Sequence, residues 1–218
     1  MTRTNLAVSA ALVIAIAVPG AGRPARADDS AGAGAAKTVS RSGIPYKVDD
    51  DSAGPKELLD AIRSRRPGGK LLNLDRMLLQ SPSFAKGWNT MFAAIRGQLE
   101  LPGKLRETAI MEIAVLNKAD YEWVQHEAEY LKAGGTKEQL AALKNVAGAM
   151  KNAKLFDEAE RATMALTSEM TRNIVVLPAT MKRIRAALPD QQVVELIGTI
   201  SGYNMVSRFV VAAGVDVE

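Results

Sequence analysis

From Glu57 to Glu218, apolar residues recur at spacings of three and four, and no stretch shows convincing alternation with a period of two. Such spacing puts the apolar side chains on one face of an α-helix, where they can be buried together. The sequence therefore predicts an all-α domain over residues 57–218. Helices are expected around Leu58–Ile62 and at 73–80, 83–99, 102–118, 120–132, from 136 onward, 157–172, 178–187 and 190–212.

Several helix boundaries carry residues that usually mark them. Ser83 and Asp120 are placed to act as N-caps, because their side-chain oxygens can accept hydrogen bonds from free backbone N–H groups. Thr136 followed by Gln139 is a capping-box signature. The 190–212 helix is the most apolar, so we expect it in the core or at a subunit interface.

The first 27 residues have the three parts of a secretory signal. Arg3 supplies the positive charge, residues 6–18 form an apolar stretch of 13 residues, and Ala25-Arg26-Ala27 has the small-x-small pattern of a cleavage site. The apolar stretch is shorter than the about 20 residues that a membrane-spanning helix needs. We therefore expect cleavage after Ala27 and export to the periplasm or the medium, with an uncleaved anchor as the alternative.

Residues 28–56 are rich in Gly, Ala, Ser and Asp and contain few large apolar side chains. This composition is typical of a flexible segment, because it offers little apolar surface to bury. We expect an N-terminal arm here. Ile44 and Tyr46 are the only apolar residues of this segment that could anchor it, and we expect that pair to dock on the helical body or on a neighbouring subunit.

Composition argues against several classes of function. The chain has 28 basic and 24 acidic residues, but three arginines and no acid lie in the leader, which leaves 25 against 24. A nearly neutral protein lacks the basic surface that binds nucleic acid or an anionic membrane, so we expect neither partner after leader cleavage. The chain also has no cysteine, which excludes a disulfide, a thiolate metal ligand and a thiol nucleophile.

The segment DYEWVQHEAEY at 120–130 contains the only histidine of the chain, His126. Glu122 precedes it by four residues and Glu129 follows it by three, so all three side chains project from one face of the expected helix. An imidazole beside carboxylates can exchange protons near neutral pH, because a nearby negative charge raises its pKa. The same spacing also fits ordinary ion pairs on an exposed helix face, and the local sequence leaves both interpretations open.

Other common site chemistries are not indicated. One histidine with carboxylates lacks the second nitrogen or sulfur ligand that zinc sites usually have, so we expect no metal. No glycine-rich phosphate loop follows a strand, and no G-x-S-x-G elbow is present. Nucleotide-dependent chemistry and serine hydrolysis therefore find no support.

Two segments, residues 71–135 and 196–218, carry the motifs Tyr-Glu-Trp-x-x-His and Gly-Tyr-Asn-Met-x-x-Arg-Phe. Over about residues 70–218 the chain resembles the carboxymuconolactone decarboxylase and AhpD-like alkylhydroperoxidase superfamily, in a branch without the Cys-x-x-Cys pair. The resemblance implies an AhpD-like helical bundle that assembles as a homotrimer or hexamer. It also implies a small-molecule pocket between helices, near the subunit contacts.

The peroxidase branch of that superfamily uses a glutamate, a Cys-x-x-Cys pair and a histidine. By resemblance, the glutamate corresponds to Glu107 and the histidine to His126, while the cysteine places fall on Ala119 and Glu122. Peroxide reduction in that branch needs an attacking thiolate and a resolving thiol, and this chain has neither. We therefore expect no cysteine-based peroxidase activity, although Glu107 and His126 remain as an acid–base pair.

The resemblance also assigns roles to individual residues. His126 is expected to be the general acid/base, Glu107 its orienting or proton-relay partner, and Glu122 a second modulator or a gate. The candidate substrate-binding residues are Trp123, Tyr203, Asn204 and Arg208. Trp123 equally suits core packing, and Arg208 can pair with a substrate carboxylate or form a surface or intersubunit salt bridge.

Two functions of different classes follow. The first is an exported lyase of the carboxymuconolactone decarboxylase type, acting without a cofactor on a small lactone or carboxylate. In that reaction His126 protonates the carbanion or enolate that remains after carbon dioxide departs. The second is a non-catalytic small-molecule-binding or scaffold oligomer, which the loss of both cysteines together with export favours.

Overall fold

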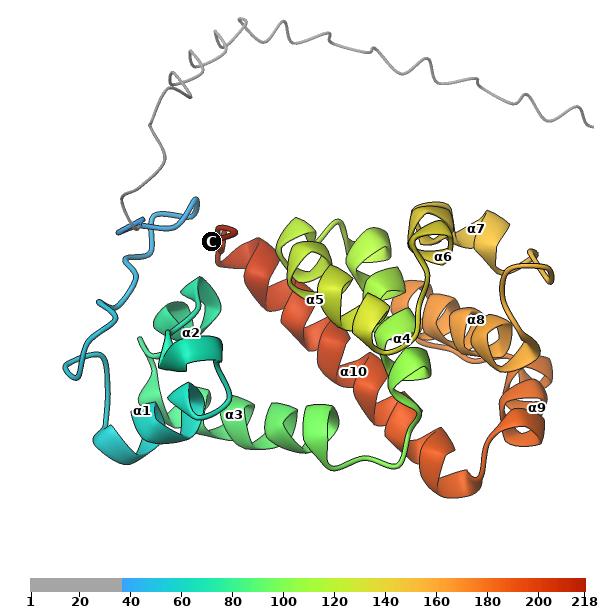
Figure 1. Ribbon diagram of the computed structural model, residues 1–218, viewed down its shortest axis with the longest axis horizontal. Coiled ribbons are helices and arrows are strands. Elements are labelled where there is room, and N and C mark those ends of the chain that lie inside the picture. The colour runs from blue at the N-terminus through green and yellow to red at the C-terminus, as the bar shows by residue number, and fades with distance from the viewer. Residues whose placement is uncertain (1–36) are drawn as a thin grey trace, which may run out of the picture. The chain divides into compact units, whose positions relative to one another are not determined.

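The computed structural model describes residues 37–218, so the predicted leader at 1–27 lies outside the described residues. The described chain is all-α, as predicted, with one isolated antiparallel bridge between Val39 and Pro45. Figure 1 shows its elements, which are α1 Lys56–Arg63, the 3-10 turn η1 Pro67–Gly69, α2 Asn73–Leu78, α3 Pro82–Gly97, α4 Gly103–Asn117, α5 Asp120–Lys132, α6 Lys137–Leu143, α7 Val146–Ala149, α8 Glu158–Arg172, α9 Pro178–Ala187 and α10 Asp190–Ala212.

Local capping chemistry explains where the helices begin. The predicted capping box of α6 is present, because Thr136 Oγ1 accepts from the Gln139 N–H and the Gln139 side chain accepts from the Thr136 N–H, each at 3.1 Å. The predicted N-caps Ser83 and Asp120 are wrong by one or two positions. Pro82 occupies the first turn of α3, so that helix starts before Ser83, and Asp120 is already the first residue of α5.

Helix α4 is the centre of the domain. It packs against α5, α8 and α10, and its residues 107–114 are buried without interruption. A helix enclosed on all sides cannot present a polar face to water. Its two fully buried carboxylates, Glu107 and Glu112, therefore depend on neighbouring side chains for hydrogen bonds.

Helix α10 is in the core, one of the two positions predicted for it. Leu196, Ile200 and Val210 are fully buried, whereas Val194 and Val211 face outward. Figure 1 shows α10 running alongside α4 and α5, and it also contacts α3, α8 and α9. A second, smaller core cluster lies under α6, α7 and α8, around Tyr130, Leu143 and Phe156.

The segment before α1 packs on the body, although its composition suggested a flexible arm over 28–56. Tyr46 is buried, and its hydroxyl donates to Asp216 Oδ2 at 3.2 Å and accepts from the Asp216 N–H at 2.8 Å. Lys37 Nζ lies 2.7 Å from Asp216 Oδ1. Of the expected docking pair, only Tyr46 is buried, and Ile44 remains 40% exposed.

Between residues 37 and 218, no helix combines the length and the apolar character needed to cross a bilayer.

Candidate functional site

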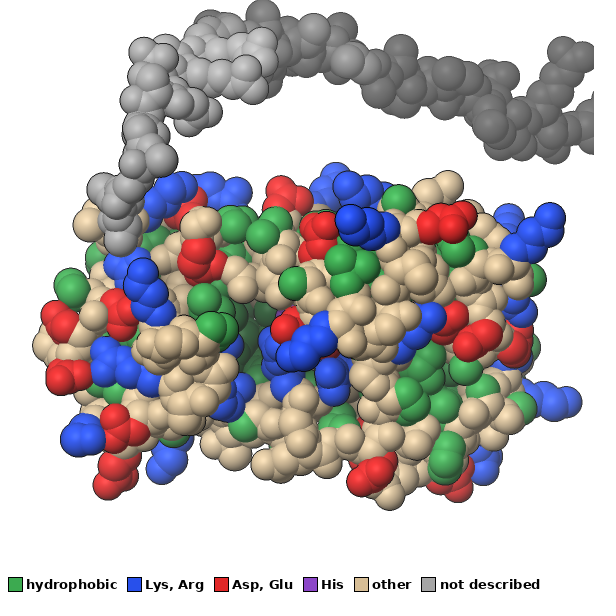
Figure 2. Space-filling view, in the orientation of Figure 1, with side chains coloured by type: hydrophobic (Ala, Val, Ile, Leu, Met, Phe, Trp, Pro, Cys, Tyr) green, Lys and Arg blue, Asp and Glu red, His purple; other side chains and the backbone are tan. Residues whose placement is uncertain are grey.

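A cleft of about 710 Å³ opens where α2, α3, α5, α10 and the residues after α1 meet. We call it the His126 cleft. Apolar side chains, among them Trp88, Phe92 and Val206, form part of its wall, and Arg65, Arg66, Arg96 and Lys132 also line it. Figure 2 shows a hollow on this face of the molecule, with hydrophobic side chains in its depth and Lys or Arg side chains around its edge.

Two residues far apart in sequence meet at the wall of this cleft. His126 Nδ1 lies 2.8 Å from Glu107 Oε2, and both side chains are buried. The turn at Lys118, which has left-handed backbone dihedrals of φ 55° and ψ 42°, ends α4 and lets α5 fold back to pack on it. The second carboxylate oxygen of Glu107 accepts from Arg106 Nε at 3.1 Å. The pair is therefore held in place from both helices.

The surroundings favour an ionised glutamate and a neutral imidazole. Burial alone would raise the pKa of Glu107, but the hydrogen bond with His126 and the nearby Arg106 and Arg96 hold that pKa below its ordinary value. Burial lowers the pKa of His126 below its ordinary value, against the opposing effect of Glu107. The Nδ1–H of a neutral imidazole then donates to the carboxylate, which leaves the Nε2 lone pair as the basic site.

Tyr203 lies beside this imidazole. The two rings meet edge to face with centroids 5.1 Å apart, and Tyr203 lines the cleft from α10. Among residues 37–218, neither the Nε2 of His126 nor the hydroxyl of Tyr203 has a hydrogen-bond partner within the protein. Both polar groups are thus available to a molecule bound in the cleft.

Glu122 lies one helical turn before His126 and lines the same cleft. Its side chain is 1% exposed, and neither carboxyl oxygen has a hydrogen-bond partner in the described part of the chain. Burial raises its pKa well above the ordinary value of a glutamate. Burial therefore favours the neutral form of this carboxyl group.

The arginines of the cleft were not among the residues predicted for the site. Arg66 forms a paired contact with Asp75 at 2.8 and 2.6 Å, and Arg96 lies 3.4 Å from Glu129. The guanidinium of Arg65 instead donates to the amide oxygen of Asn89, at 3.0 Å from Nε. Among residues 37–218, no carboxylate pairs with Arg65. The only sequence signal for it was its place in the segment Arg65-Arg66-Pro-Gly-Gly, which follows the first expected helix.

Three predicted substrate-binding residues lie outside the cleft. Trp123 packs on the second core cluster, with the Lys144 ammonium 5.5 Å from its ring centroid. Asn204 is hydrogen-bonded to Asn117 and Thr171, and Arg208 donates to the Asn204 carbonyl. Neighbouring helix positions point about 100° apart. When Glu122 and Tyr203 face the cleft, Trp123 and Asn204 must therefore face elsewhere, and Arg208 follows Asn204 at the i+4 position.

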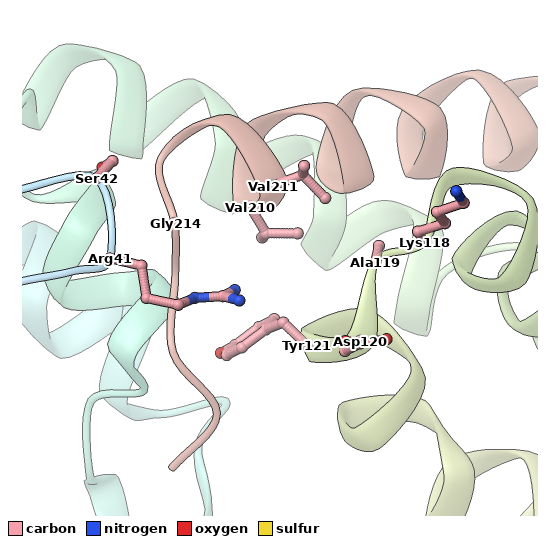
Figure 3. A pocket seen from close by; sticks show the side chains of 9 residues that line it. All are labelled: Arg41, Ser42, Lys118, Ala119, Asp120, Tyr121, Val210, Val211 and Gly214. Carbon is pink, nitrogen blue, oxygen red and sulfur yellow. The ribbon is translucent and has the colours of Figure 1, made fainter. Parts of the chain in front are cut away.

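The first of the two cysteine places also lies outside the cleft. Ala119 lines a separate hollow of about 230 Å³, together with Arg41, Tyr121 and the end of α10. Figure 3 shows Arg41 extending into this hollow from the N-terminal segment and Tyr121 entering it from α5. Tyr121 lines both hollows, so it stands between them. Only the second cysteine place, Glu122, faces the same cleft as His126.

Within residues 37–218, no cluster of three or more His, Asp or Glu side chains is arranged to hold a metal ion. The hydrogen-bonded pair His126–Glu107 is suited to proton transfer, and the cationic side chains of the cleft are suited to anion binding. A family model described as the Carboxymuconolactone decarboxylase family matches residues 82–169, a range that contains Glu107, Glu122 and His126. The match covers the part of the chain that carries the candidate site. No protein of curated function matches the chain in sequence.

Solved structures show that the fold is AhpD-like. The AhpD core of an uncharacterized peroxidase-related protein from Ralstonia eutropha aligns with a TM-score of 0.70 and 16% identity, covering 84% of this chain and 94% of that one. A peroxidase-related protein from Silicibacter gives 0.64 and 18%, with coverages of 79% and 91%. The debrominase Bmp8 gives 0.67 and 15%, also with 79% and 91%. At these identities the likeness concerns the fold alone.

Proposed function

We propose that this protein belongs to the carboxymuconolactone decarboxylase family and is a proton-transfer enzyme of the carboxy-lyase type, acting without a cofactor on a small lactone carboxylate. One observation carries the proposal, namely the 2.8 Å contact between His126 Nδ1 and Glu107 Oε2 at the wall of the His126 cleft. An ionised carboxylate on Nδ1 fixes the imidazole tautomer and orientation, so that Nε2 can take and return a proton at a bound substrate.

The chemistry needs one proton at carbon. When the bond between the substrate and its carboxylate breaks, carbon dioxide leaves and the bonding electron pair stays on the substrate as a carbanion or enolate. The neutral His126 first takes up a proton at Nε2 from solvent, then delivers that proton to the carbon and returns to its neutral form. Burial lowers the pKa of His126, so its protonated form is a stronger acid than a solvated imidazolium.

Arg65 supports a negatively charged substrate. Its guanidinium lines the cleft and has no carboxylate partner among residues 37–218, whereas Arg66 and Arg96 are paired with acids. A guanidinium can bind a carboxylate through two parallel N–H···O hydrogen bonds, which fixes orientation as well as charge. In this proposal Arg65 takes the role that the sequence suggested for Arg208.

A small ring substrate fits the size of the cleft. Its volume of about 710 Å³ lies within the range of about 300–1,000 Å³ typical of small-molecule sites. The debrominase Bmp8, which has the same fold, was solved in complex with 2,3,4-tribromopyrrole, itself a small ring compound. We do not expect thiol peroxidase activity, because the chain has no cysteine.

The setting of the enzyme is also part of the proposal. We infer from the leader sequence that the mature chain begins near Asp28 and acts in the periplasm or the medium. We further infer a homo-oligomer, as the family resemblance implies. N-terminal sequencing of the exported protein and light scattering of the purified chain test these two inferences separately.

The decisive experiment is a screen of the mature protein for carbon dioxide release from unsaturated lactone carboxylates. The informative variant is His126→Asn, because asparagine keeps an N–H donor for Glu107 while removing the titratable nitrogen. We expect its turnover to fall by at least a hundredfold. Trp123→Phe is the matched control, since Trp123 neighbours the site on α5 but lies outside the cleft, and it should retain activity.

Full turnover by folded His126→Asn protein would overturn the proposal. Ligands that bind in the cleft of the wild-type protein without any chemical change would instead support the second function, a small-molecule-binding protein that keeps the fold and has lost catalysis.

A further inference from the structure

The side chain of Glu122 is the least explained polar group in the His126 cleft. It is 1% exposed, and both carboxyl oxygens lack a hydrogen-bond partner in the part of the chain that the structure describes. Its neighbour one turn away, His126, is satisfied by Glu107. A buried carboxyl without partners lowers stability, and such groups are rare in folded proteins unless they have a use.

The position of Glu122 indicates what that use is. It lines the same cleft as His126, from the same face of α5, because the two residues are separated by four positions. No cation forms an ion pair with it among residues 37–218. The protein itself leaves this hydrogen-bonding group unsatisfied at the wall of a cleft large enough for a small molecule. Its two oxygens have almost no exposed surface, so they reach a ligand once the side chain rotates toward the cleft.

We propose that Glu122 is a further catalytic residue, which enters the reaction as a neutral carboxylic acid and donates its O–H to the substrate oxygen on which negative charge develops. The inference rests on the proposed proton-transfer function, and it names the group that the site recognises, a carbonyl, lactone or carboxylate oxygen. In this arrangement His126 moves the proton, Arg65 binds a substrate carboxylate, and Glu122 stabilises the enolate oxygen.

The charges around the site agree with different roles for the two glutamates, Glu107 and Glu122. His126 and two arginines favour the ionised form of Glu107, whereas Glu122 has no such partners and burial favours its protonated form. Two carboxyl groups in one site that are pushed in opposite directions can take different roles. A neutral Glu122 also avoids the repulsion that a second carboxylate would exert on an anionic substrate.

The benefit of such a donor is largest in the transition state. A hydrogen bond to an oxygen that is gaining negative charge strengthens as the charge develops, and water is largely excluded from the position of Glu122. Removal of one donor of this kind typically lowers turnover by about a hundredfold to a thousandfold.

Infrared spectroscopy of the full-length protein tests the inference without a known substrate. A protonated carboxyl group has a C=O stretching band separate from that of carboxylates, and we expect such a band at pH 7 that disappears in Glu122→Gln. Glu112 provides the matched control. It is also fully buried with a raised pKa, but it accepts from Ser168 Oγ at 2.6 Å and does not line the cleft. Its band should disappear only in Glu112→Gln.

Binding of benzoate, an unreactive carboxylate, should shift the Glu122 band to lower frequency and leave the Glu112 band in place. The inference is overturned if Glu122 contributes no protonated band at pH 7, or if its band does not move when calorimetry shows that benzoate is bound. Both outcomes are independent of whether the lyase reaction is found.

With an active substrate, a pair of similarly sized variants separates a donor role from a structural one. Glu122→Gln keeps an N–H donor and should retain turnover within about tenfold, whereas Glu122→Leu fills the same space without a donor and should lose about a hundredfold or more. Equal turnover by both folded variants would overturn the donor role, even if His126→Asn abolishes the reaction. If Glu122→Leu loses turnover while His126→Asn keeps full activity, the proposed function of His126 is contradicted and the donor role of Glu122 still stands.

Discussion

Glu122 and His126 lie one turn apart on α5 and line the same cleft, yet only His126 has a polar partner among the described residues. The difference arises because α4 presents Glu107 opposite His126, while nothing capable of a hydrogen bond reaches Glu122. Burial favours the neutral form of both groups, by lowering the pKa of His126 and raising that of Glu122. The negative charge of this trio is therefore concentrated on Glu107.

The titration of His126 should reveal its coupling to Glu107. We expect the pKa of His126 to lie below 6.5, because burial lowers it, and to fall further in Glu107→Gln, because the carboxylate opposes that effect. The chain has one histidine, so the imidazole proton resonance in a pH series followed by nuclear magnetic resonance needs no assignment.

The exposed carboxylate Glu127, on the same helix, gives a control variant. Glu127→Gln should leave the titration midpoint of His126 almost unchanged. A midpoint that rises in Glu107→Gln, or that does not respond to it, would show that the contact between the two side chains is not formed in solution.

Glu122 should make the stability of the protein depend on pH. Its pKa in the folded state is raised above the ordinary value of 4.5, so the folded chain holds a proton that the unfolded chain releases. The wild-type protein therefore loses stability as pH rises from about 4.5 toward the folded-state pKa, by up to about 1.4 kcal/mol for each unit of pKa elevation. Glutamine does not titrate.

Glu122→Gln should accordingly gain stability relative to the wild type as pH rises through this range. Urea unfolding at pH 4.5 and at pH 7.5 measures the difference, with Glu127→Gln as the exposed control. A relative gain that is the same at both pH values would mean that the pKa of Glu122 is not raised in the folded protein.

The sequence contained the central part of the site but not its full extent. The three-and-four spacing predicted the helices, and the motif at 120–130 together with Glu107 predicted a pair that the structure brings to 2.8 Å. Adjacent motif residues were taken together, although neighbouring helix positions face different ways, and so Trp123 and Asn204, both offered as candidate pocket residues, lie outside the His126 cleft.

Residues that join the site through tertiary packing were missed for another reason. Arg65, Trp88 and Phe92 come from α3 and from the residues after α1, and their periodicity shows only that one face is buried. Which buried face borders a cleft depends on how helices cross, and that information is not present in local spacing. The docking of Tyr46 also depends on a distant partner, Asp216.

The two candidate arginines give opposite predictions for anion binding. Arg65 lines the His126 cleft without a carboxylate partner, whereas Arg208 is exposed at a separate hollow and donates to Asn204. Arg65→Gln should weaken benzoate binding by about tenfold or more, since loss of a charge-assisted hydrogen bond costs about 1.5–3 kcal/mol. Arg208→Gln should bind benzoate like the wild type. Calorimetry measures both, and the reverse ranking would return the anion-binding role to Arg208.

The N-terminal segment should depend on Tyr46 for its attachment. The Tyr46 hydroxyl makes two hydrogen bonds with Asp216, a residue that is 5% exposed near the other end of the described chain. Tyr46→Phe keeps the ring in place but leaves the Asp216 N–H without its partner and one carboxylate oxygen without this donor. Because one of the two bonds involves a carboxylate, we expect a loss of about 1–3 kcal/mol in the free energy of unfolding.

A second tyrosine makes the comparison direct. Tyr130 is fully buried in the second core cluster, and its hydroxyl has no hydrogen-bond partner in the described part of the chain. Tyr130→Phe removes the same atom without breaking such a bond, so its effect on stability should be the smaller of the two. Urea unfolding gives both values, and limited proteolysis should cut residues 37–55 faster in Tyr46→Phe alone. Equal losses in the two variants, with unchanged proteolysis, would mean that the segment is held by its other contacts, such as the ion pair between Lys37 and Asp216.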